Sequence, residues 1–475
     1  MKRLLVLSMA AVALSVAGSS FLGAQTAAPG QTVKGPDERF KTDILVVVAH
    51  PDDEGGVTPY LARAIYDEHK RVAVVFATRG GSGGNDYARE HGPALADIRE
   101  QEARAACAKL GITKVWFLEG KDTASQNVLN SLANWGHGAN LEALVRIVRL
   151  TRPEVIFTWL PEILIGENHG DHQAAGVLAT EAFDLAGQET AFPAQVTGAT
   201  KRLEVYLENL TPWQPKKLYY FSDADDQKQF DRAGPAYSVK EVSPSQKKPY
   251  WRLALDAATP HLTQFPEDIH RITAMSDGEI NKFMEDPQHM WWSEPMTLIF
   301  GKAAGYPSAV PVTDVFAPPA PTKPVEIKEL PLGGGTLRPH VELGGPWGYY
   351  QAFYRKHGPQ QKLFPSTAEI GVKSGSVLDV PLVFSRMTLS GEPPTHLKIS
   401  IQVPARWKVL SGDGEVILPG GQEDQFHVEI AAPELGKEEL AKLSAQDVIV
   451  RATLNGQEQS EVRLKVQLKA SALAQ

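Results

Sequence analysis

The chain has 475 residues, which suggests two or three domains, and with 43% hydrophobic and 22% charged residues it has the composition of a globular protein. Its formal net charge of −8 gives no general electrostatic reason to expect a nucleic acid partner. The one cysteine, Cys107, excludes an intrachain disulfide, and the helical pattern around it predicts a buried structural thiol.

The N-terminus has the pattern of a bacterial secretory signal peptide. Two basic residues precede an apolar run that ends near Val16, and small residues then lead to an expected cleavage after Ala24. The run is too short, and too often interrupted, for a membrane anchor, and no second apolar span follows in the sequence. Residues 1–24 are therefore predicted to be a signal peptide, and the protein to be exported to the periplasm or beyond with no transmembrane segment.

Apolar strand patterns then alternate with helical patterns. Strands are predicted at 42–51, 71–78, 114–120 and 153–160. This alternation indicates an α/β fold with a Rossmann-like, mostly parallel sheet and helices on both faces, in which ligands bind beyond the carboxyl ends of the strands. The loop RGGSGGN after the second strand lacks the Gly-Lys-Ser/Thr ending of a phosphate-binding loop, so we expect it to form the rim of a site.

The remainder of the chain divides into three parts. Less regular segments complete the first domain, residues 40–300, and a Pro- and Gly-rich stretch lies in a predicted linker or connector, residues 301–368. Alternating patterns separated by turns predict an immunoglobulin-like, antiparallel β-sandwich over residues 369–470. This module is a glycan-binding module or a structural spacer. The structural role is favoured because Trp407 is the only tryptophan in its strands and turns.

Two clusters of histidine and carboxylate residues follow predicted strands, in the motifs AHPDDE and ENHGDHQ. They contain His50, Asp52, Asp53, His169, Asp171 and His172. Because the carboxyl ends of parallel strands share one edge of a sheet, we expect the clusters to converge. Histidine nitrogen and carboxylate oxygen suit zinc or a similar divalent ion, which in catalytic sites takes three protein ligands. The alternative is a pair of solvated polar turns.

The two motifs, in this order and in this βα context, resemble those of the zinc-dependent PIG-L/LmbE-like de-N-acetylases. The resemblance covers about residues 40 to 300, and it includes the helix with Arg99 and the late His-x-x-Gln segment ATPHLTQ, 258–264. The family includes deacetylases of GlcNAc-phosphatidylinositol, mycothiol and bacillithiol biosynthesis. An exported enzyme would not meet the cytosolic thiol-pathway intermediates, so their substrates are not transferred to this chain.

By position, the resemblance implies roles for the motif residues. His50, Asp53 and His172 would be the metal ligands, with Zn²⁺ as the expected ion and another divalent metal such as Fe²⁺ as the alternative. Asp52 would be the general base that takes a proton from the attacking water. His169 would stabilise the oxyanion or protonate the leaving amine.

Three further residues are assigned by the same resemblance, each with a structural alternative. Asp171 would orient a histidine, or else cap a helix. Arg99 would contact the substrate, or else form a surface ion pair with Glu102. Asp122 would accept hydrogen bonds from sugar hydroxyls, or else be a turn residue. The Trp291–Trp292 pair is expected in the core or at an interface rather than as a platform for a sugar.

Together these patterns predict an exported, metal-dependent hydrolase that removes the acetyl group from an N-acetylated amino sugar or glycoconjugate. One alternative keeps the chemistry and changes the substrate to a larger N-acyl conjugate. Another is a non-catalytic carbohydrate-binding protein, against which Asp52 argues because binding alone needs no general base. The oligomeric state is left open.

Overall fold

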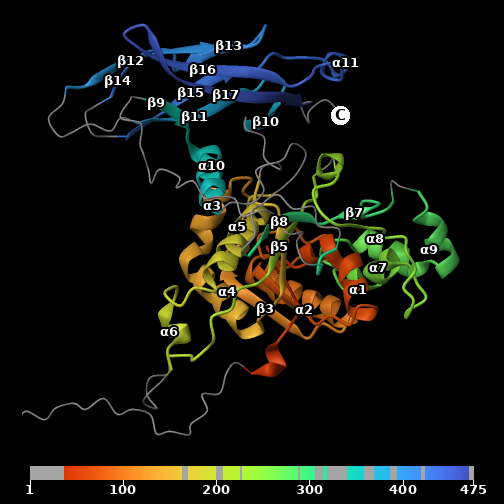
Figure 1. Ribbon diagram of the computed structural model, residues 1–475. Coiled ribbons are helices and arrows are strands. Elements are labelled where there is room, and N and C mark those ends of the chain that lie inside the picture. Colours follow the sequence, from red (N-terminus) through yellow and green to blue (C-terminus); the bar gives the residue numbers. More distant parts are fainter. Residues whose placement is uncertain are drawn as a thin grey trace, which may run out of the picture. The chain divides into compact units, whose positions relative to one another are not determined.

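The computed structural model describes most of the chain (Figure 1). The described residues are 37–162, 169–198, 207–224, 227–286, 289–304, 314–317, 340–357, 368–385, 393–418 and 423–469. The predicted signal peptide lies outside them. Within these ranges, every helix falls short of the length and apolar character that a membrane span requires.

A six-stranded sheet forms the centre of the N-terminal part, in the order β3-β2-β1-β4-β5-β8. Its strands are β1 Ile44–Val48, β2 Val72–Thr78, β3 Lys114–Gly120, β4 Val155–Trp159, β5 Lys217–Phe221 and β8 Ile299–Ala303. The first five are parallel, and β8 pairs with β5 in the antiparallel direction. All residues of β1, β2, β4 and β5 are buried, as near-continuous apolar runs in a parallel sheet predict. The predicted Rossmann-like sheet is confirmed.

Helices cover this sheet in two groups. They are α1 Thr58–Tyr66, α2 Pro93–Lys109, α3 Val128–Trp135, α4 His137–Thr151, α5 Gly170–Leu185, α6 Pro193–Val196, α7 Tyr250–Ala258, α8 Pro266–Ala274 and α9 Asp277–Phe283. α3, α4 and α5 contact one another, while α1 and α2 contact α7 (Figure 1). Right-handed crossovers place the two groups on opposite faces, because the strand order runs β1-β2-β3 in one direction and β1-β4-β5 in the other. The order therefore reverses between β1 and β4, where such folds bind ligands.

Several short elements complete this part of the chain. They are η1 Glu38–Phe40, η2 Asp53–Val57, η3 Gln227–Phe230, β6 Ala236–Tyr237 and β7 Met296–Thr297. The 3-10 turn η2 matters most for the site, because it begins within the first sequence motif, at Asp53. The single cysteine, Cys107, is buried in α2, as predicted.

The C-terminal part is built of strands in two sheets, ordered β10-β17-β16-β12-β14 and β13-β15-β11-β9. Its elements are β9 His340–Leu343, β10 Ala368–Lys373, β11 Val377–Ser385, β12 Thr395–Gln402, β13 Lys408–Ser411, β14 Gly414–Leu418, β15 Glu423–Ala431, α11 Lys437–Leu440, β16 Gln446–Leu454 and β17 Gln457–Lys469. The pairing is antiparallel as predicted, except that β10 runs parallel to β17. Trp407 is buried in this core and its indole N–H donates to Gln446 Oε1 at 3.1 Å, so it offers no exposed ring to a glycan.

The segment predicted as a linker also contains regular structure, namely β9 and the helix α10 Gly345–His357. The prediction missed both because the neighbouring Pro- and Gly-rich stretch dominated the composition there. Tyr350 and Phe353 of α10 are buried in the same apolar core as the central sheet. The Tyr350 hydroxyl donates to Gln173 of α5, and the Tyr354 hydroxyl donates to the carbonyl of Pro161 after β4.

Candidate active site

The two predicted clusters meet where the strand order reverses. His50 follows β1 by two residues, and the second cluster opens α5, the helix that follows β4. β1 and β4 are neighbours in the sheet, so their carboxyl ends deliver both clusters to one cavity. The cavity measures about 1380 Å³, and all the predicted metal-ligand and acid–base residues except the fully buried Asp171 line it.

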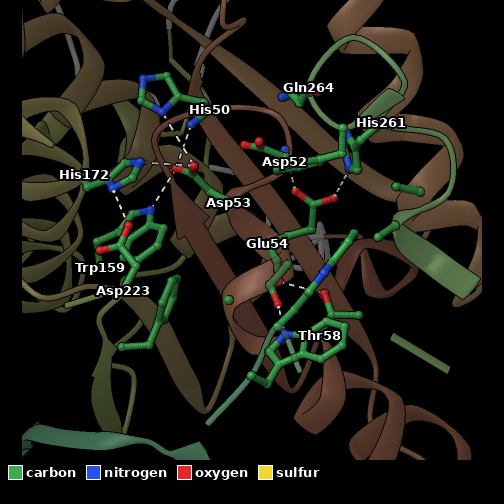
Figure 2. Close-up of a pocket in the computed structure, with 18 of the residues that line it drawn as sticks. His50, Asp52, Asp53, Glu54, Thr58, Trp159, His172, Asp223, His261 and Gln264 are labelled. Carbon is green, nitrogen blue, oxygen red and sulfur yellow. Dashed lines mark hydrogen bonds and ion pairs between the residues drawn. The ribbon is translucent and has the colours of Figure 1, made fainter. Parts of the chain in front are cut away.

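Asp53 lies at the centre of the site (Figure 2). Its Oδ2 accepts the backbone N–H groups of Ala49 and His50, both at 2.9 Å, and the indole N–H of Trp159 at 2.8 Å. Its Oδ1 lies 3.6 Å from His50 Nδ1 and 3.3 Å from His172 Nε2. Burial disfavours the charged carboxylate, but the two histidines outweigh it and hold the pKa of Asp53 well below its usual range. Oδ1 is therefore the oxygen left to face a ligand shared with both imidazoles.

The other ring nitrogen of His50 faces two carboxylates. His50 Nε2 lies 3.1 Å from Asp122 Oδ1 and 3.3 Å from Asp171 Oδ2. Asp171 is fully buried and also accepts the backbone N–H and the hydroxyl of Thr123, at 2.8 and 2.9 Å. Although burial opposes the charged imidazole, these acids and Asp53 raise the pKa of His50 well above its usual value. When the ring is neutral, as a metal ligand must be, the two carboxylates at Nε2 favour the tautomer protonated there, which leaves the lone pair of Nδ1 on the side of Asp53.

His172 is held by two residues that the sequence prediction missed. Its ring stacks on Trp159 with centroids 4.2 Å apart and planes 6° apart, and its Nδ1 lies 3.5 Å from Asp223 Oδ2. Burial lowers the pKa of His172, but Asp53 and Asp223 raise it by more than burial lowers it, so that the pKa lies at about 9. Trp159 is the last residue of β4, and Asp223 follows β5 by two residues. Ligands of such folds bind at the carboxyl ends of the parallel strands, and this rule, applied to β4 and β5, would have identified both residues.

This donor set fits a divalent metal ion. His50 Nδ1, Asp53 Oδ1 and His172 Nε2 offer two imidazole nitrogens and one carboxylate oxygen, the ligand types and number of many catalytic zinc sites. In the part of the chain that the structure describes, His50, His169 and His172 also each present a nitrogen within 4.8 Å of the others. The outward nitrogens of His50 and His172 already have carboxylate neighbours, as metal-binding histidines usually do.

Asp52 has a backbone conformation that few residues other than glycine adopt, with φ of 101°. Such a conformation typically costs about 1–3 kcal/mol and persists where the surrounding structure imposes it. Here the Asp52 N–H donates to Glu54 Oε2 at 3.0 Å. Its carboxylate lines the cavity and accepts no hydrogen bond from the described residues. Burial and the neighbouring charge of Asp53 raise the pKa of Asp52 to about 7.

The His-x-x-Gln segment, residues 258–264, forms hydrogen bonds with the turn that carries Asp52. His261 is buried, and its Nε2 lies 2.8 Å from Glu54 Oε1. The Gln264 side chain donates to the carbonyl of Pro51. The His-x-x-Gln segment therefore fixes both sides of Asp52.

His169 caps α5 and faces the cavity. Its Nδ1 accepts the backbone N–H of Asp171 at 3.3 Å, so the cap is His169 and the predicted alternative of Asp171 as the cap is wrong. Its ring centroid lies 5.3 Å from that of His50 and 5.5 Å from that of His172. Burial and these two histidines lower the pKa of His169. The neutral ring accepts at Nδ1 and so carries its proton on Nε2, where it can donate a hydrogen bond.

Arg99 is buried in α2 and holds the glycine-rich loop. Its Nη1 donates to the carbonyl of Gly80 at 3.0 Å and its Nη2 to that of Gly84 at 2.7 Å. The alternative of a surface ion pair with Glu102 is wrong, because Arg99 points inward and Glu102 instead accepts hydrogen bonds from Thr263. Contact between Arg99 and a substrate stays a prediction.

Asp122 links that loop to His50, one of the predicted metal ligands. Its Oδ2 accepts the backbone N–H of Ser82 at 2.7 Å, and the Ser82 hydroxyl donates to the Asp122 carbonyl at 2.7 Å. Since its Oδ1 lies beside His50, both carboxylate oxygens face protein groups. Asp122 therefore does more than form a turn, because its carboxylate also contacts the ring of His50. Its contact with sugar hydroxyls stays a prediction.

The tryptophan pair differs from expectation. Trp292 is buried as expected, and its indole N–H donates to the carbonyl of Gly55 at 2.7 Å. Trp291 is 38% exposed and lines the cavity, so a core position is wrong for this residue, and an interface position stays a prediction. Adjacent residues in an irregular segment face different ways, which the sequence pattern did not reveal.

Comparison with known proteins identifies the family. The family model described as PIG-L: GlcNAc-PI de-N-acetylase matches residues 45–183, which include both motifs. A 1D-myo-inositol 2-acetamido-2-deoxy-alpha-D-glucopyranoside deacetylase from Frankia alni is 28% identical over 255 residues, which cover 50% of this chain and 77% of the relative. A deacetylase of the same description from Frankia casuarinae is 32% identical over 263 residues, 51% of this chain and 74% of the relative.

Among solved structures, the N,N'-diacetylchitobiose deacetylase from Pyrococcus horikoshii aligns with a TM-score of 0.36 and 20% identity, over 54% of this chain and 83% of that chain. The assignment rests on the family model and on the Frankia casuarinae relative, which passes 30% identity over most of its length. The resemblance seen in the two motifs is confirmed, and the chain belongs to the PIG-L family of GlcNAc-PI de-N-acetylases.

Proposed function

We propose that this protein is an exported, metal-dependent hydrolase that removes the acetyl group from an N-acetylated amino sugar or glycoconjugate. The observation that carries the proposal is Asp53 Oδ1, which faces one nitrogen each of His50 and His172 in the cavity that the carboxylate of Asp52 also lines, without a hydrogen bond from any described residue. The family relatives are named as deacetylases of an acetamido sugar joined to inositol, which supports this substrate class. Export is supported by the N-terminal sequence pattern alone.

His50, Asp53 and His172 would hold the ion, with Zn²⁺ as the expected metal. When bound, such an ion supplies a Lewis acid that polarises the amide carbonyl and lowers the pKa of a water molecule toward about 7. The surrounding carboxylates then have a defined task. Asp122 and Asp171 hold the far nitrogen of His50, so that its near nitrogen keeps one orientation.

The remaining residues move protons. Asp52 lines the same cavity with its carboxylate free of hydrogen bonds from the described chain, as a base that must accept a proton requires. It would take a proton from water as the water oxygen bonds to the acetyl carbon. His169, with its proton on Nε2, would donate to the oxyanion that develops. The carbon–nitrogen bond then breaks, the amine leaves with a proton, and acetate is the second product.

The test is acetate release by the zinc-loaded protein from a panel of N-acetylated sugars. Asp52→Asn is expected to lower the rate by about 10²–10⁴-fold while the bound zinc, measured by elemental analysis, stays the same. Asp97→Asn is the matched control, because Asp97 pairs with Arg79 on the exposed face of α2 and does not line the cavity. Zinc-loaded protein that releases no acetate from any of these sugars would refute the proposal. Full activity in Asp52→Asn would refute the role of Asp52.

The size of the cavity favours one second candidate, an amidase for larger N-acyl conjugates. At about 1380 Å³ the cavity exceeds the roughly 300–1,000 Å³ of ordinary small-molecule sites. Amine release from glucosamines with N-acyl chains of increasing length separates the two functions. A deacetylase loses rate as the chain lengthens, whereas the amidase gains rate.

A further inference from the structure

Two tyrosines of α10 form hydrogen bonds with the segments that carry the site. The buried Tyr350 donates its hydroxyl proton to Gln173 of α5, and the partly buried Tyr354 donates to the carbonyl of Pro161, which follows β4. α10 therefore contacts both neighbouring segments that bring the second motif and Trp159 to the cavity. The helix lies outside residues 45–183, the part of the chain that the family model matches.

Gln173 belongs to the first turn of α5, which also carries site residues. It directly follows His172, a predicted metal ligand, and His169 caps the same turn. His169 and His172 line the cavity, whereas Gln173 is fully buried and its side chain contacts α10. The Gln173 backbone N–H also donates to the carbonyl of His169, at 3.1 Å. A displacement of Gln173 is therefore a displacement of the turn that holds both histidines.

The end of β4 is packed tightly against α5. A Cβ atom at Gly176 of α5 would lie 2.3 Å from the carbonyl oxygen of Trp159 and 2.9 Å from the nitrogen of Pro161, so the helix approaches this stretch with no space to spare. Trp159 in turn stacks on His172 and donates to Asp53 Oδ2. The separation between α5 and the end of β4 therefore sets how His172 meets both of these residues.

The two hydroxyls supply a constraint that the aromatic rings alone do not. Apolar packing is non-directional, so phenylalanine rings would fill the same core without selecting one arrangement. A hydrogen bond needs its donor and acceptor aligned, and it therefore fixes the position of its partner. Burial raises the pKa of Tyr350 and of Tyr354 well above the usual value, so both hydroxyls keep their protons and remain donors.

We propose that Tyr350 and Tyr354 are positioning residues of the active site, which hold the first turn of α5 and the end of β4 in the arrangement in which His172 faces Asp53. Neither tyrosine lines the cavity, so both act through the residues to which they donate. This inference deepens the proposed function and rests on it for the identity of the ion. It gives α10 a part in metal binding in addition to its part in the apolar core.

The experiment measures zinc affinity by competition with a chromophoric chelator, well below the melting temperature of every variant. Tyr350→Phe and Tyr354→Phe are each expected to bind zinc about two- to fivefold more weakly, because each loses one buried hydrogen bond and part of that free energy acts on the turn with His172. Gln173→Met removes the other partner of the Tyr350 bond and should cause a similar loss. The double variant Tyr350→Phe with Gln173→Met should lose little more than either single variant, since both changes break the same bond.

Phe353→Leu is the matched control, because Phe353 is buried in the same helix and has no hydroxyl. It is expected to lower Tm at least as much as Tyr350→Phe does and to leave zinc affinity unchanged. A purely stabilising role of α10 predicts instead that zinc affinity follows Tm, with the weakest binding in Phe353→Leu, and that result would overturn the proposal. Unchanged zinc affinity in both tyrosine variants would overturn it as well.

Zinc binding is measured without turnover, which separates this inference from the proposed function. If the tyrosine variants bind zinc more weakly but no sugar releases acetate from the unchanged protein, the reaction is refuted and the positioning role stands. If every variant releases acetate and binds zinc as tightly as the unchanged protein, the positioning role is refuted and the reaction stands. A protein that binds no zinc would refute both.

Discussion

Asp171 offers the sharpest test of the proposed metal site, because it is fully buried and contacts His50 on the side away from Asp53. Asp171→Asn keeps the shape of the side chain and removes the charge 3.3 Å from His50 Nε2. A hydrogen bond to a charged group contributes about 1.5–3 kcal/mol and a neutral one about 0.5–1.5 kcal/mol, so the change costs about 1–1.5 kcal/mol. That corresponds to a loss of about five- to tenfold in zinc affinity.

This loss lies at or just below the lower limit of the roughly 10–100-fold range that is typical for such supporting residues. The reason is Asp122, whose carboxylate remains 3.1 Å from the same nitrogen. The double variant Asp122→Asn with Asp171→Asn removes both charges, and we expect it to bind zinc more weakly than the sum of the single losses predicts, because residues that share one partner do not act additively.

The assay is competition for zinc against a chromophoric chelator at neutral pH. Asp184→Asn is the control, because Asp184 lies on the same helix, α5, but pairs with Lys302 and His357 instead of the predicted metal ligands. Its zinc affinity should equal that of the unchanged protein even if its melting temperature falls. Zinc binding by Asp171→Asn as tight as that of the unchanged protein would refute the idea that Asp171 fixes His50.

Three further outcomes are expected. Arg149 is fully buried and donates to four backbone carbonyls between residues 186 and 192. Arg149→Ala should therefore lower the free energy of unfolding, measured by urea titration, by more than about 3 kcal/mol. A smaller change would contradict this account. Tyr350→Phe removes the hydroxyl that donates to Gln173 and should lower Tm by a few degrees, whereas Tyr87→Phe, with its exposed ring, should not. Zinc at 100 times its Kd should add about 2.7 kcal/mol to the free energy of unfolding. Removing the zinc with a chelator should therefore lower Tm, and adding it back should restore Tm.

The central sheet was predictable because its strands are buried on both faces. The runs at β1 and β2 are apolar without interruption, a pattern that a parallel sheet covered by helices requires. The convergence of the clusters around His50 and His172 followed from the same rule, since the carboxyl ends of neighbouring parallel strands lie together.

The partners of those residues could not be predicted in the same way. The bond from the Trp159 indole to Asp53 joins residues 106 positions apart, and the spacing of the motifs carries no information about it. Arg99 shows a second limit, because an arginine three residues before a glutamate is usual on an exposed helix, and only the tertiary structure turns this one inward. The position of Trp291 depends in the same way on a segment without periodic pattern.

The docking of α10 has a practical consequence for dissecting the chain. A truncated protein that stops at residue 300, where the sequence pattern suggests a boundary, would lose Tyr350 and Phe353 from the apolar core and uncover the face of α5 on which Tyr350 rests. Such a fragment should aggregate or be cleaved readily by proteases, because its exposed apolar face has no cover. A fragment that ends after His357 keeps this helix, together with the contacts of His357 and Lys302 with Asp184, and is the one to express for catalysis without the sandwich.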